Sequence, residues 1–237
     1  MPFIERYRAT SQRIIDRIFE TQLANIGRAA DLVADVAGRD DVVYAFGSGH
    51  SSLVATEFCG RAGGLACFDL INDKTFGKAE RLDGYARVLL DSCPIKSRDA
   101  LIIVSNSGRN AVPVEMALEA QNRGIPTVAI TSLDHSRQVL SRHRSGRNLY
   151  EICDIVIDTC CPLGDAVVEL PGMSGRPVGA TSTLAGAFIA NCIVVLAASR
   201  SRARGVEQRV IVSMNVDEGD AMNRELSELL RMHTRDL

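Results

Sequence analysis

The chain has 237 residues, of which 46% are hydrophobic, and its formal net charge is −2 at neutral pH. This length suits one large α/β domain or two small ones, and the balanced charge argues against binding of nucleic acid or a membrane surface through an overall field. Seven cysteines without a CxxC pair are typical of reduced thiols, and Met1-Pro2 leads into a charged amphipathic segment unlike a signal peptide. We therefore expect a cytoplasmic globular protein.

The first part of the chain is predicted to be a long helix followed by a strand. Apolar residues recur at helical spacing between Ile4 and Val36, which predicts a helix over residues 3–37. A short apolar strand over 41–46 then leads into Gly47-Ser48-Gly49-His50-Ser51-Ser52, and a helical pattern resumes over 53–61. A loop of small residues therefore joins a strand to a helix.

The middle of the chain repeats this alternation. Residues 100–104 form a continuous apolar run, which is typical of a strand buried on both faces of a parallel sheet, and a helix over 111–123 follows with Pro113 in its first turn. The pattern predicts further strands over 65–70, 127–130 and 154–158, a helix over 78–91, and a basic, partly helical segment over 136–147.

The last part of the chain contains a loop, an apolar helix and a tail. Residues 164–178 are rich in Gly and Pro and are predicted to be a loop, and a helix of small residues follows over 181–199. Its most apolar run, 184–198, is shorter than a bilayer span and contains Asn191, so we expect a core helix. The tail from Glu207 looks irregular until Asp220, which can cap a last helix to about residue 232.

Alternating strands and helices predict a single α/β domain, a three-layer sandwich around a five-stranded parallel sheet. It would comprise the N-terminal helix (3–37), an α/β core (40–200) and a C-terminal tail (207–237). If the strand order is 2-1-3-4-5, the winding reverses between the first and third strands, and ligands bind at their carboxyl ends. Those two strands precede the two serine-rich loops.

The serine-rich loops are candidates for phosphate binding. The second loop, Ser105-Asn106-Ser107-Gly108-Arg109-Asn110, opens a helix as the first does, and free N–H groups with short hydroxyl donors suit a compact dianion. The first loop lacks the third glycine of a dinucleotide fingerprint and the lysine of a P-loop, and ordinary turn chemistry is the alternative interpretation. The candidate binding residues are Ser48, Gly49, Ser51, Ser52, Ser105, Asn106, Ser107 and Asn110, with Ser132, Thr181 and Ser182 as further donors or helix caps.

His50 and Glu57 are candidate catalytic residues. They are nearly two helical turns apart and would share a helix face with Leu53 between them. A carboxyl group beside apolar side chains has a raised pKa, which suits a general acid or base near neutral pH. The alternatives are that Glu57 pairs with Arg61 at i+4 and that His50 only closes the loop. No His/Cys spacing indicates a metal site.

Four segments of the sequence resemble the sugar isomerase (SIS) domain. They are FGSGHSS, LIIVSNSGRN, AITS and GATSTLAGAFIAN, and the resemblance extends over essentially the whole chain. It is closest to single-domain SIS proteins allied to phosphoheptose isomerases. The resemblance implies a flavodoxin-like strand order, phosphosugar binding at the two loops, and dimers or tetramers with sites near subunit contacts.

The resemblance also suggests roles for individual residues. Ser51, Ser105 and Ser107 match phosphate-binding serines, and Asn110 stands where another hydroxyl residue often occurs. Glu57 is similar to the helix glutamate that phosphoheptose isomerases use as an acid/base. Those enzymes also use a histidine on the late helix; none occurs in 181–199, so the second group would come from His50, His135 or a neighbouring subunit.

These observations predict a homo-oligomeric sugar-phosphate isomerase that needs no cofactor or metal. The alternatives are a non-catalytic phosphosugar-binding or regulatory protein, and an amino-sugar phosphate lyase (etherase). One N-terminal helical segment is too little for a helix-turn-helix module, so we expect neither a nucleic acid nor a membrane partner.

Overall fold

A five-stranded parallel sheet forms the centre of the protein, whose computed structural model describes residues 2–224 and 226. The strands lie in the order β2-β1-β3-β4-β5, which confirms the predicted 2-1-3-4-5 arrangement. Val43 of β1 is in register with Phe68 of β2 on one side and with Ala100 of β3 on the other. The strand bounds are β1 (Val43–Gly47), β2 (Phe68–Ile71), β3 (Ala100–Val104), β4 (Thr127–Thr131) and β5 (Ile155–Asp158).

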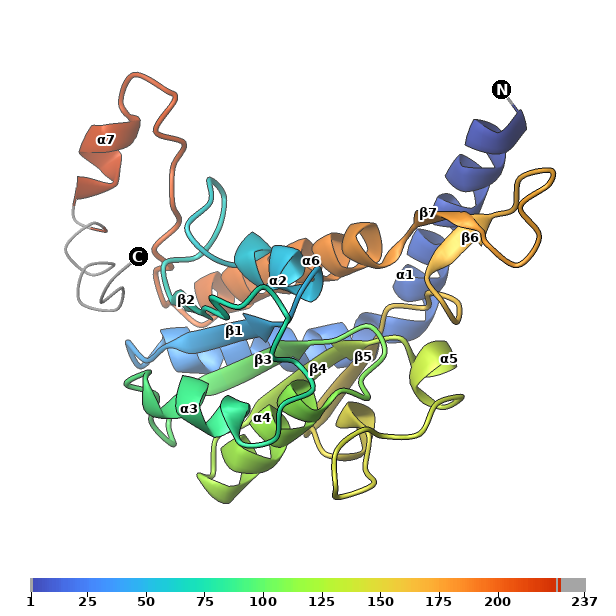
Figure 1. Ribbon diagram of the computed structural model, residues 1–237. Helices are drawn as coiled ribbons and strands as arrows, with labels where there is room; N and C mark the ends of the chain where they lie inside the picture. The colour runs from blue at the N-terminus through green and yellow to red at the C-terminus, as the bar shows by residue number, and fades with distance from the viewer. Residues whose placement is uncertain (1, 225, 227–237) are drawn as a thin grey trace.

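Helices cover both faces of the sheet, as Figure 1 shows. One face packs against α1 (Pro2–Ala37), α2 (Ser51–Glu57) and α6 (Ser182–Ala203). The other face packs against α3 (Tyr85–Asp91), α4 (Ala111–Asn122) and the short 3-10 helix η1 (Leu149–Glu151). The α/β sandwich with a long N-terminal helix is therefore confirmed.

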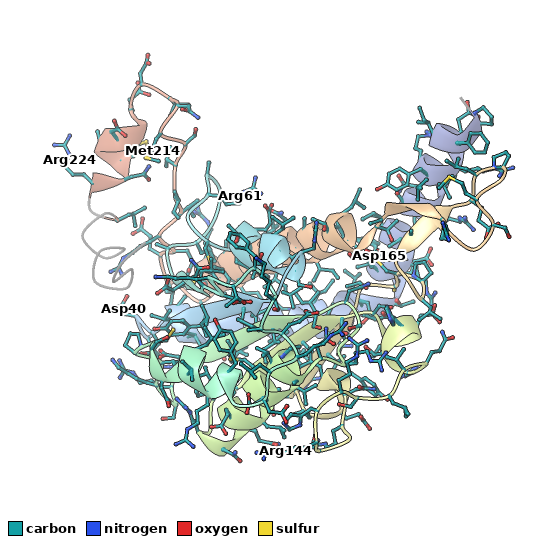
Figure 2. The ribbon with its side chains drawn as sticks, viewed as in Figure 1. Asp40, Arg61, Arg144, Asp165, Met214 and Arg224 are labelled. Carbon is teal, nitrogen blue, oxygen red and sulfur yellow. The ribbon has the colours of Figure 1, made fainter. Side chains whose placement is uncertain are left out.

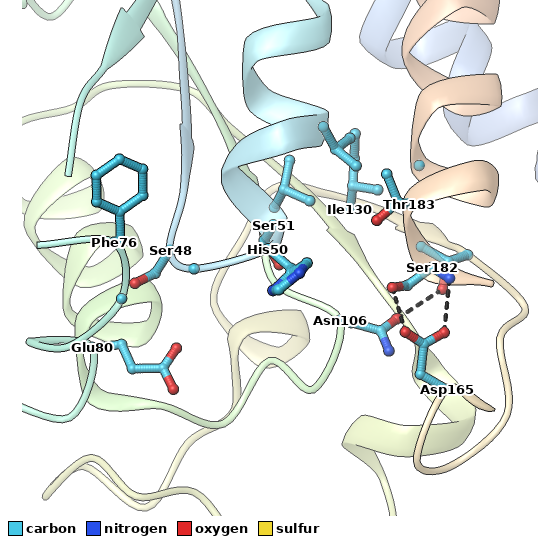
Figure 3. Close-up of a pocket in the computed structure, with 16 residues that line it drawn as sticks. Ser48, His50, Ser51, Phe76, Glu80, Asn106, Ile130, Asp165, Ser182 and Thr183 are labelled. Carbon is cyan, nitrogen blue, oxygen red and sulfur yellow. Dashed lines mark hydrogen bonds between the residues drawn. The ribbon is translucent and has the colours of Figure 1, made fainter. Parts of the chain in front are cut away.

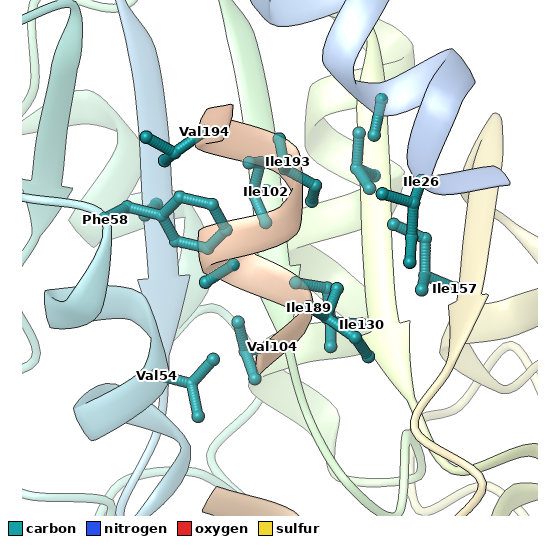
Figure 4. Close-up of a cluster of buried hydrophobic side chains, with 14 of the residues drawn as sticks. Ile26, Val54, Phe58, Ile102, Val104, Ile130, Ile157, Ile189, Ile193 and Val194 are labelled. Atoms are coloured by element: carbon teal, nitrogen blue, oxygen red, sulfur yellow. The ribbon is translucent and has the colours of Figure 1, made fainter. Parts of the chain in front are cut away.

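The larger core lies between the sheet and α6. Ile189 and Ile193 of α6 pack with Ile102, Val104 and other apolar side chains in one buried cluster (Figure 4). The helix α6 is long and apolar enough to span a membrane by length and composition alone. Packing against α1 and α2 accounts for part of this apolar character, since Ile189 and Ile193 are buried there, whereas Leu184 and Val195 are exposed.

Two helices are shorter than the sequence predicts. The predicted helix 78–91 begins only at Tyr85, because the Asp73 carboxylate binds the backbone N–H groups of Thr75 and Gly77 and holds the preceding segment in turns. The predicted helix 53–61 starts earlier, at Ser51, and ends at Glu57.

Two predictions for the second half were also inaccurate. In the basic segment 136–147 only Ser136 is helical, at the end of α5 (Leu133–Ser136), because the Asn148 side chain binds the carbonyls of Ser136 and Val139 and folds the segment back. The predicted loop 164–178 contains strand β6 (Ala166–Val168), which pairs antiparallel with β7 (Val178–Ala180).

The tail packs beside the segment that leads into β2. Ile211 exchanges backbone hydrogen bonds with Gly63 and Gly64, and Val210 bridges to Leu65. The short helix α7 (Gly219–Met222) follows. The predicted last helix begins within α7, which ends at Met222, and residues 225 and 227–232 of the prediction lie outside the described residues.

Candidate functional site

A cavity of about 350 Å³ lies at the carboxyl ends of β1 and β3, where the winding of the sheet reverses. Both serine-rich loops reach it, the first through Ser48 to Ser51 and the second through Asn106. In Figure 3, Ser48, Phe76 and Glu80 lie on one side, Asp165, Ser182 and Thr183 lie on the other, and His50 and Asn106 lie between them. We call these sides the β2-side wall and the α6-side wall.

The β2-side wall is organised by Asp73. This buried carboxylate accepts hydrogen bonds from the Thr75 hydroxyl (2.6 Å), the Gly77 N–H (3.0 Å) and the Ser48 hydroxyl (3.2 Å). Burial alone would raise the pKa of Asp73, but hydrogen bonds from Thr75, Gly77 and Tyr85 outweigh burial and leave the pKa below its ordinary value. Asp73 therefore stays ionised and joins the loop after β2 to the loop after β1.

Phe76 lies on the segment that Asp73 holds. Its φ is 50°, in the left-handed region that bulky residues rarely adopt, and its ring is 83% exposed at the cavity. The next residue, Gly77, passes so close to the first loop that a Cβ atom would lie 2.7 Å from the Gly49 nitrogen. Phe76 therefore presents an aromatic ring to solvent at the edge of a polar cavity.

The α6-side wall is organised by Asp165. One carboxylate oxygen accepts from the backbone N–H groups of Thr181 (2.9 Å) and Ser182 (2.7 Å), and the other accepts from the Ser182 hydroxyl (2.6 Å). Asp165 thus caps the 22-residue helix α6, where a negative charge interacts favourably with the helix dipole. Both of its carboxylate oxygens are already engaged.

Glu80 is the second carboxylate at the cavity. Its backbone carbonyl accepts from the Val112 N–H, but within residues 2–224 its carboxylate has no hydrogen-bond or ion-pair partner. His50 is exposed and lines the same cavity. The cavity therefore combines an available carboxylate and an imidazole with hydroxyl and amide donors.

The second serine loop contributes less surface to this cavity than the first. Ser105 is buried and its hydroxyl accepts from the Gly108 N–H, the Ser107 carbonyl accepts from the Ser136 hydroxyl, and Asn110 accepts from Arg142. These groups hold the loop in place, and Asn106 is the member that lines the cavity.

The remaining predicted binding residues also divide into residues that line the cavity and residues whose side chains hydrogen-bond within the protein. Gly49, Ser51 and Ser182 line the cavity. The Ser52 hydroxyl donates to the Gly49 carbonyl, and Ser132 caps α5. The buried Thr181 hydroxyl donates to Asp165.

Glu57 is placed outside this cavity. It lies at the end of α2, where its carboxylate pairs with Arg61 and accepts a hydrogen bond of 2.8 Å from Asn191 of α6. The i+4 pairing with Arg61 is the alternative that the spacing allowed. Glu57 does not line the cavity with His50.

His135 and the cysteines also lie away from the cavity lining. Burial lowers the pKa of His135, and together with the charge of Arg109 it outweighs the opposing charges of Asp165 and Asp134. All seven cysteines are free, and burial raises the pKa of Cys160 to about 11, so this thiol is protonated at neutral pH. Among the described residues no group of His, Cys, Asp or Glu is arranged to hold a metal ion.

Sequence reasoning missed Phe76, Glu80, Thr159 and Asp165 as residues that line the cavity. A signal existed for Glu80 and Phe76, because the polar segment after the second strand also emerges at the carboxyl edge of the sheet. Asp165 carried no local signal, since it caps a helix that begins 17 residues later in the chain.

Comparisons with known proteins agree with this architecture. The SIS domain family profile matches residues 6–132. The UPF0309 protein ABC0887 of Shouchella clausii is 35% identical to this chain, and the alignment covers 96% of each protein.

Two solved structures share the fold at low identity. A phosphoheptose isomerase from Francisella tularensis is 14% identical, with a TM-score of 0.58 over 82% of this chain and 95% of that chain. The sugar isomerase domain of an RpiR transcription factor from Sphaerobacter thermophilus is 16% identical, with a TM-score of 0.54 over 96% of this chain and 99% of that chain. Since the profile spans more than half of the chain and the relative matches almost all of it, the protein belongs to the SIS domain family and, within it, to the UPF0309 proteins.

Proposed function

We propose that this SIS-domain protein binds a sugar phosphate in the cavity and interconverts its aldose and ketose forms, as a cytoplasmic homo-oligomer. One observation carries the proposal: two serine-bearing loops, far apart in sequence, meet at a polar cavity where the Glu80 carboxylate has no partner within residues 2–224. Phosphoheptose isomerase is among the proteins with this fold, which supports the same class of substrate.

The donors of the first loop suit the phosphate group. Ser51 supplies a hydroxyl at the carboxyl end of β1, and Asn106 supplies an amide from the neighbouring loop. The Ser48 hydroxyl already donates to Asp73 and holds the loop in place. The exposed ring of Phe76 lies at the same cavity and suits the apolar C–H face of a sugar. Hydroxyls of Ser182 and Thr183 on the α6-side wall would then orient the sugar hydroxyls.

We assign the proton transfer to Glu80. Isomerisation needs a base that moves a proton between adjacent carbons and an acid that donates to the carbonyl oxygen. Asp165 is engaged as a helix cap, whereas Glu80 has unengaged lone pairs at the cavity. His50 lies on the opposite loop and can act as the acid.

A thermal-shift panel of aldose and ketose phosphates with the full-length protein tests the binding step. Ligands that bind the native state raise the melting temperature, and the matching free sugars should not. Hits would then be incubated with the enzyme and the products identified. If no sugar phosphate raises the melting temperature, the proposed function is wrong.

Paired glutamate variants test the assignment of the base. Glu80→Gln should lower kcat by about 100-fold or more, with the ligand-induced shift retained, because the amide keeps the shape and cannot accept the proton. Glu57→Gln is the matched variant, since the sequence analysis predicts that role for Glu57. Loss of turnover in Glu57→Gln but not in Glu80→Gln would transfer the role to Glu57.

A non-catalytic phosphosugar sensor is the second candidate. The fold is also that of the sugar isomerase domain of a transcription factor, which covers nearly all of this chain. Binding without turnover of any hit would select the sensor. Release of a lactyl group from an amino-sugar phosphate would instead select the etherase.

A further inference from the structure

We propose that Arg81, Arg109 and Arg142 form a second anion subsite beside the cavity, which takes an additional oxyanion of the ligand. This proposal rests on the proposed function for the first phosphate, and it narrows the ligand class to sugar phosphates with a second phosphate or a carboxylate. We call the three residues the arginine cluster.

Three separate loops bring the arginine cluster together at the start of α4. The Arg142 N–H donates to the Arg109 carbonyl (2.7 Å), and an Arg142 guanidinium nitrogen donates to the Asn110 side chain (2.8 Å). The Val112 N–H donates to the carbonyl of Glu80 (3.0 Å), which fixes the neighbouring Arg81 against the same helix start. These contacts hold the loops after β2, β3 and β4 together.

The three positive charges lie close enough to influence one another. Burial lowers the pKa of Arg142, the charges of Arg81 and Arg109 lower it further, and Glu80 acts in the opposite direction. Clustering of like charges costs free energy, and a bound anion would remove that cost.

In the part of the chain that the structure describes, no carboxylate forms an ion pair with the arginine cluster, and the charge of Glu80 only partly offsets those of Arg81 and Arg109 at Arg142. Other arginines, such as Arg39, Arg98 and Arg123, form ion pairs with aspartates. Arg81, Arg109 and Arg142 form none with any described carboxylate, and the buried Nε of Arg109 has no hydrogen-bond partner. A buried guanidinium N–H without an acceptor is unfavourable, so an oxyanion ligand would satisfy it.

The arginine cluster adjoins the proposed sugar site. Arg81 follows Glu80, and Arg109 lies three residues after Asn106, and both Glu80 and Asn106 line the cavity. Arginine side chains match the planar geometry of carboxylate and phosphate oxygens. A ligand whose phosphate lies at Ser51 would therefore direct a second oxyanion toward the arginine cluster, on the side of the cavity where Glu80 lies.

The test compares affinities by calorimetry for four probes: inorganic phosphate, glucose 6-phosphate, fructose 1,6-bisphosphate and 6-phosphogluconate. At low salt the full-length protein should bind the bisphosphate, the phosphosugar acid or both at least about tenfold more tightly than glucose 6-phosphate. The two doubly anionic probes distinguish a second phosphate from a carboxylate. The preference should weaken as salt is added.

Arg81→Ala is the decisive variant, because Arg81 is exposed and makes no hydrogen bond within residues 2–224 that its loss would disrupt. The affinity for the doubly anionic probe, divided by that for glucose 6-phosphate, should fall to about one in Arg81→Ala. Arg142→Ala should lower the same ratio. The matched control is Arg144→Ala. Arg144 is an exposed arginine on the same loop as Arg142, and Figure 2 shows Arg144 at the lower edge of the molecule. Arg144→Ala should keep the ratio.

Two results would overturn the inference. One is equal affinity of the full-length protein for singly and doubly anionic sugars; the other is a preference that persists in Arg81→Ala and Arg142→Ala. If glucose 6-phosphate binds and neither doubly anionic probe binds better, only the second subsite is wrong. If none of the sugar phosphates binds, the proposed function fails as well. Binding of inorganic phosphate at the cluster without a preference among the sugars also counts against the inference.

Discussion

The two serine-bearing loops of this protein follow the same local plan and end in different environments. Each connects a buried strand to a helix, and each contains a glycine with φ near 60°, Gly49 (59°) in the first loop and Gly108 (60°) in the second. A Cβ atom on Gly49 would meet nothing within 4 Å. A Cβ atom on Gly108 would lie 2.8 Å from the Ser136 hydroxyl and 3.0 Å from the Thr131 hydroxyl.

This difference separates loops that contact a ligand from loops that support the site. The first loop has an open side toward the cavity. The second is covered by residues near α5, whose side chains hydrogen-bond to its backbone. The presence of serine and glycine in a loop therefore does not decide its role, because the neighbouring segment determines which groups remain available.

The largest expected effect comes from replacing the two glycines. Gly108→Ala should lower the free energy of unfolding by about 3 kcal/mol, because backbone strain adds to a clash with two hydroxyls. Gly49→Ala should cost only about 1 kcal/mol, from backbone strain alone. Denaturant unfolding of both variants measures the difference. Equal losses would contradict the distinction between the loops.

Asp73→Asn tests how the first loop is held. At pH 7 the variant should lose about 2 kcal/mol of stability, since several hydrogen bonds to a charged acceptor become bonds to a neutral amide. Ser136 holds the second loop through a neutral hydroxyl, so the loss of stability in Ser136→Ala should be independent of pH.

The pH dependence of Asp73→Asn has a definite sign. The pKa of Asp73 is lower in the folded protein than the unfolded value of about 3.9, so the carboxylate stabilises the fold above that pH. Its contribution is lost as the pH falls from there through the folded pKa. The stability difference between the parent and Asp73→Asn should therefore narrow below about pH 4, and a constant difference would show that charge is not the cause.

The smallest pair of effects comes from one serine in each loop. Ser51→Ala should weaken sugar-phosphate binding roughly tenfold and change stability little, because the Ser51 hydroxyl lines the cavity. Ser105→Ala should chiefly reduce stability, by about 1 kcal/mol, through loss of the bond from Gly108. Calorimetry and denaturant unfolding separate the two, and an exchange of these phenotypes would reverse the assignment of the loops.

The parallel strands were predictable from the sequence pattern, whereas the strand order, and with it the edge that holds the cavity, followed from the resemblance to SIS domains. Apolar runs such as 100–104 mark buried parallel strands, and the edge where ligands bind follows from the reversal of winding. His50 and Ser51 were accordingly expected at the edge where the cavity lies.

The side-chain contacts of the site were less predictable, because they depend on partners distant in sequence. Asp165 faces the cavity through its cap of α6, and Asn110 is occupied by Arg142, 32 residues away. Glu80 looked like part of a helix, and turns stabilised by Asp73 replaced that helix. A local pattern cannot reveal the long-range bonds of Asp165 and Asn110, whereas the Asp73 bonds span only two and four residues.

Phe76 has a consequence for how this protein would respond to selection in the laboratory. Its left-handed backbone costs about 1–3 kcal/mol of stability, and because its side chain is largely exposed, burial of the ring offsets little of that cost. Phe76→Asn, with a side chain that tolerates this conformation, should raise the melting temperature and weaken sugar-phosphate affinity. A screen for thermostability run without ligand would therefore enrich variants that fold better and recognise their substrate less well.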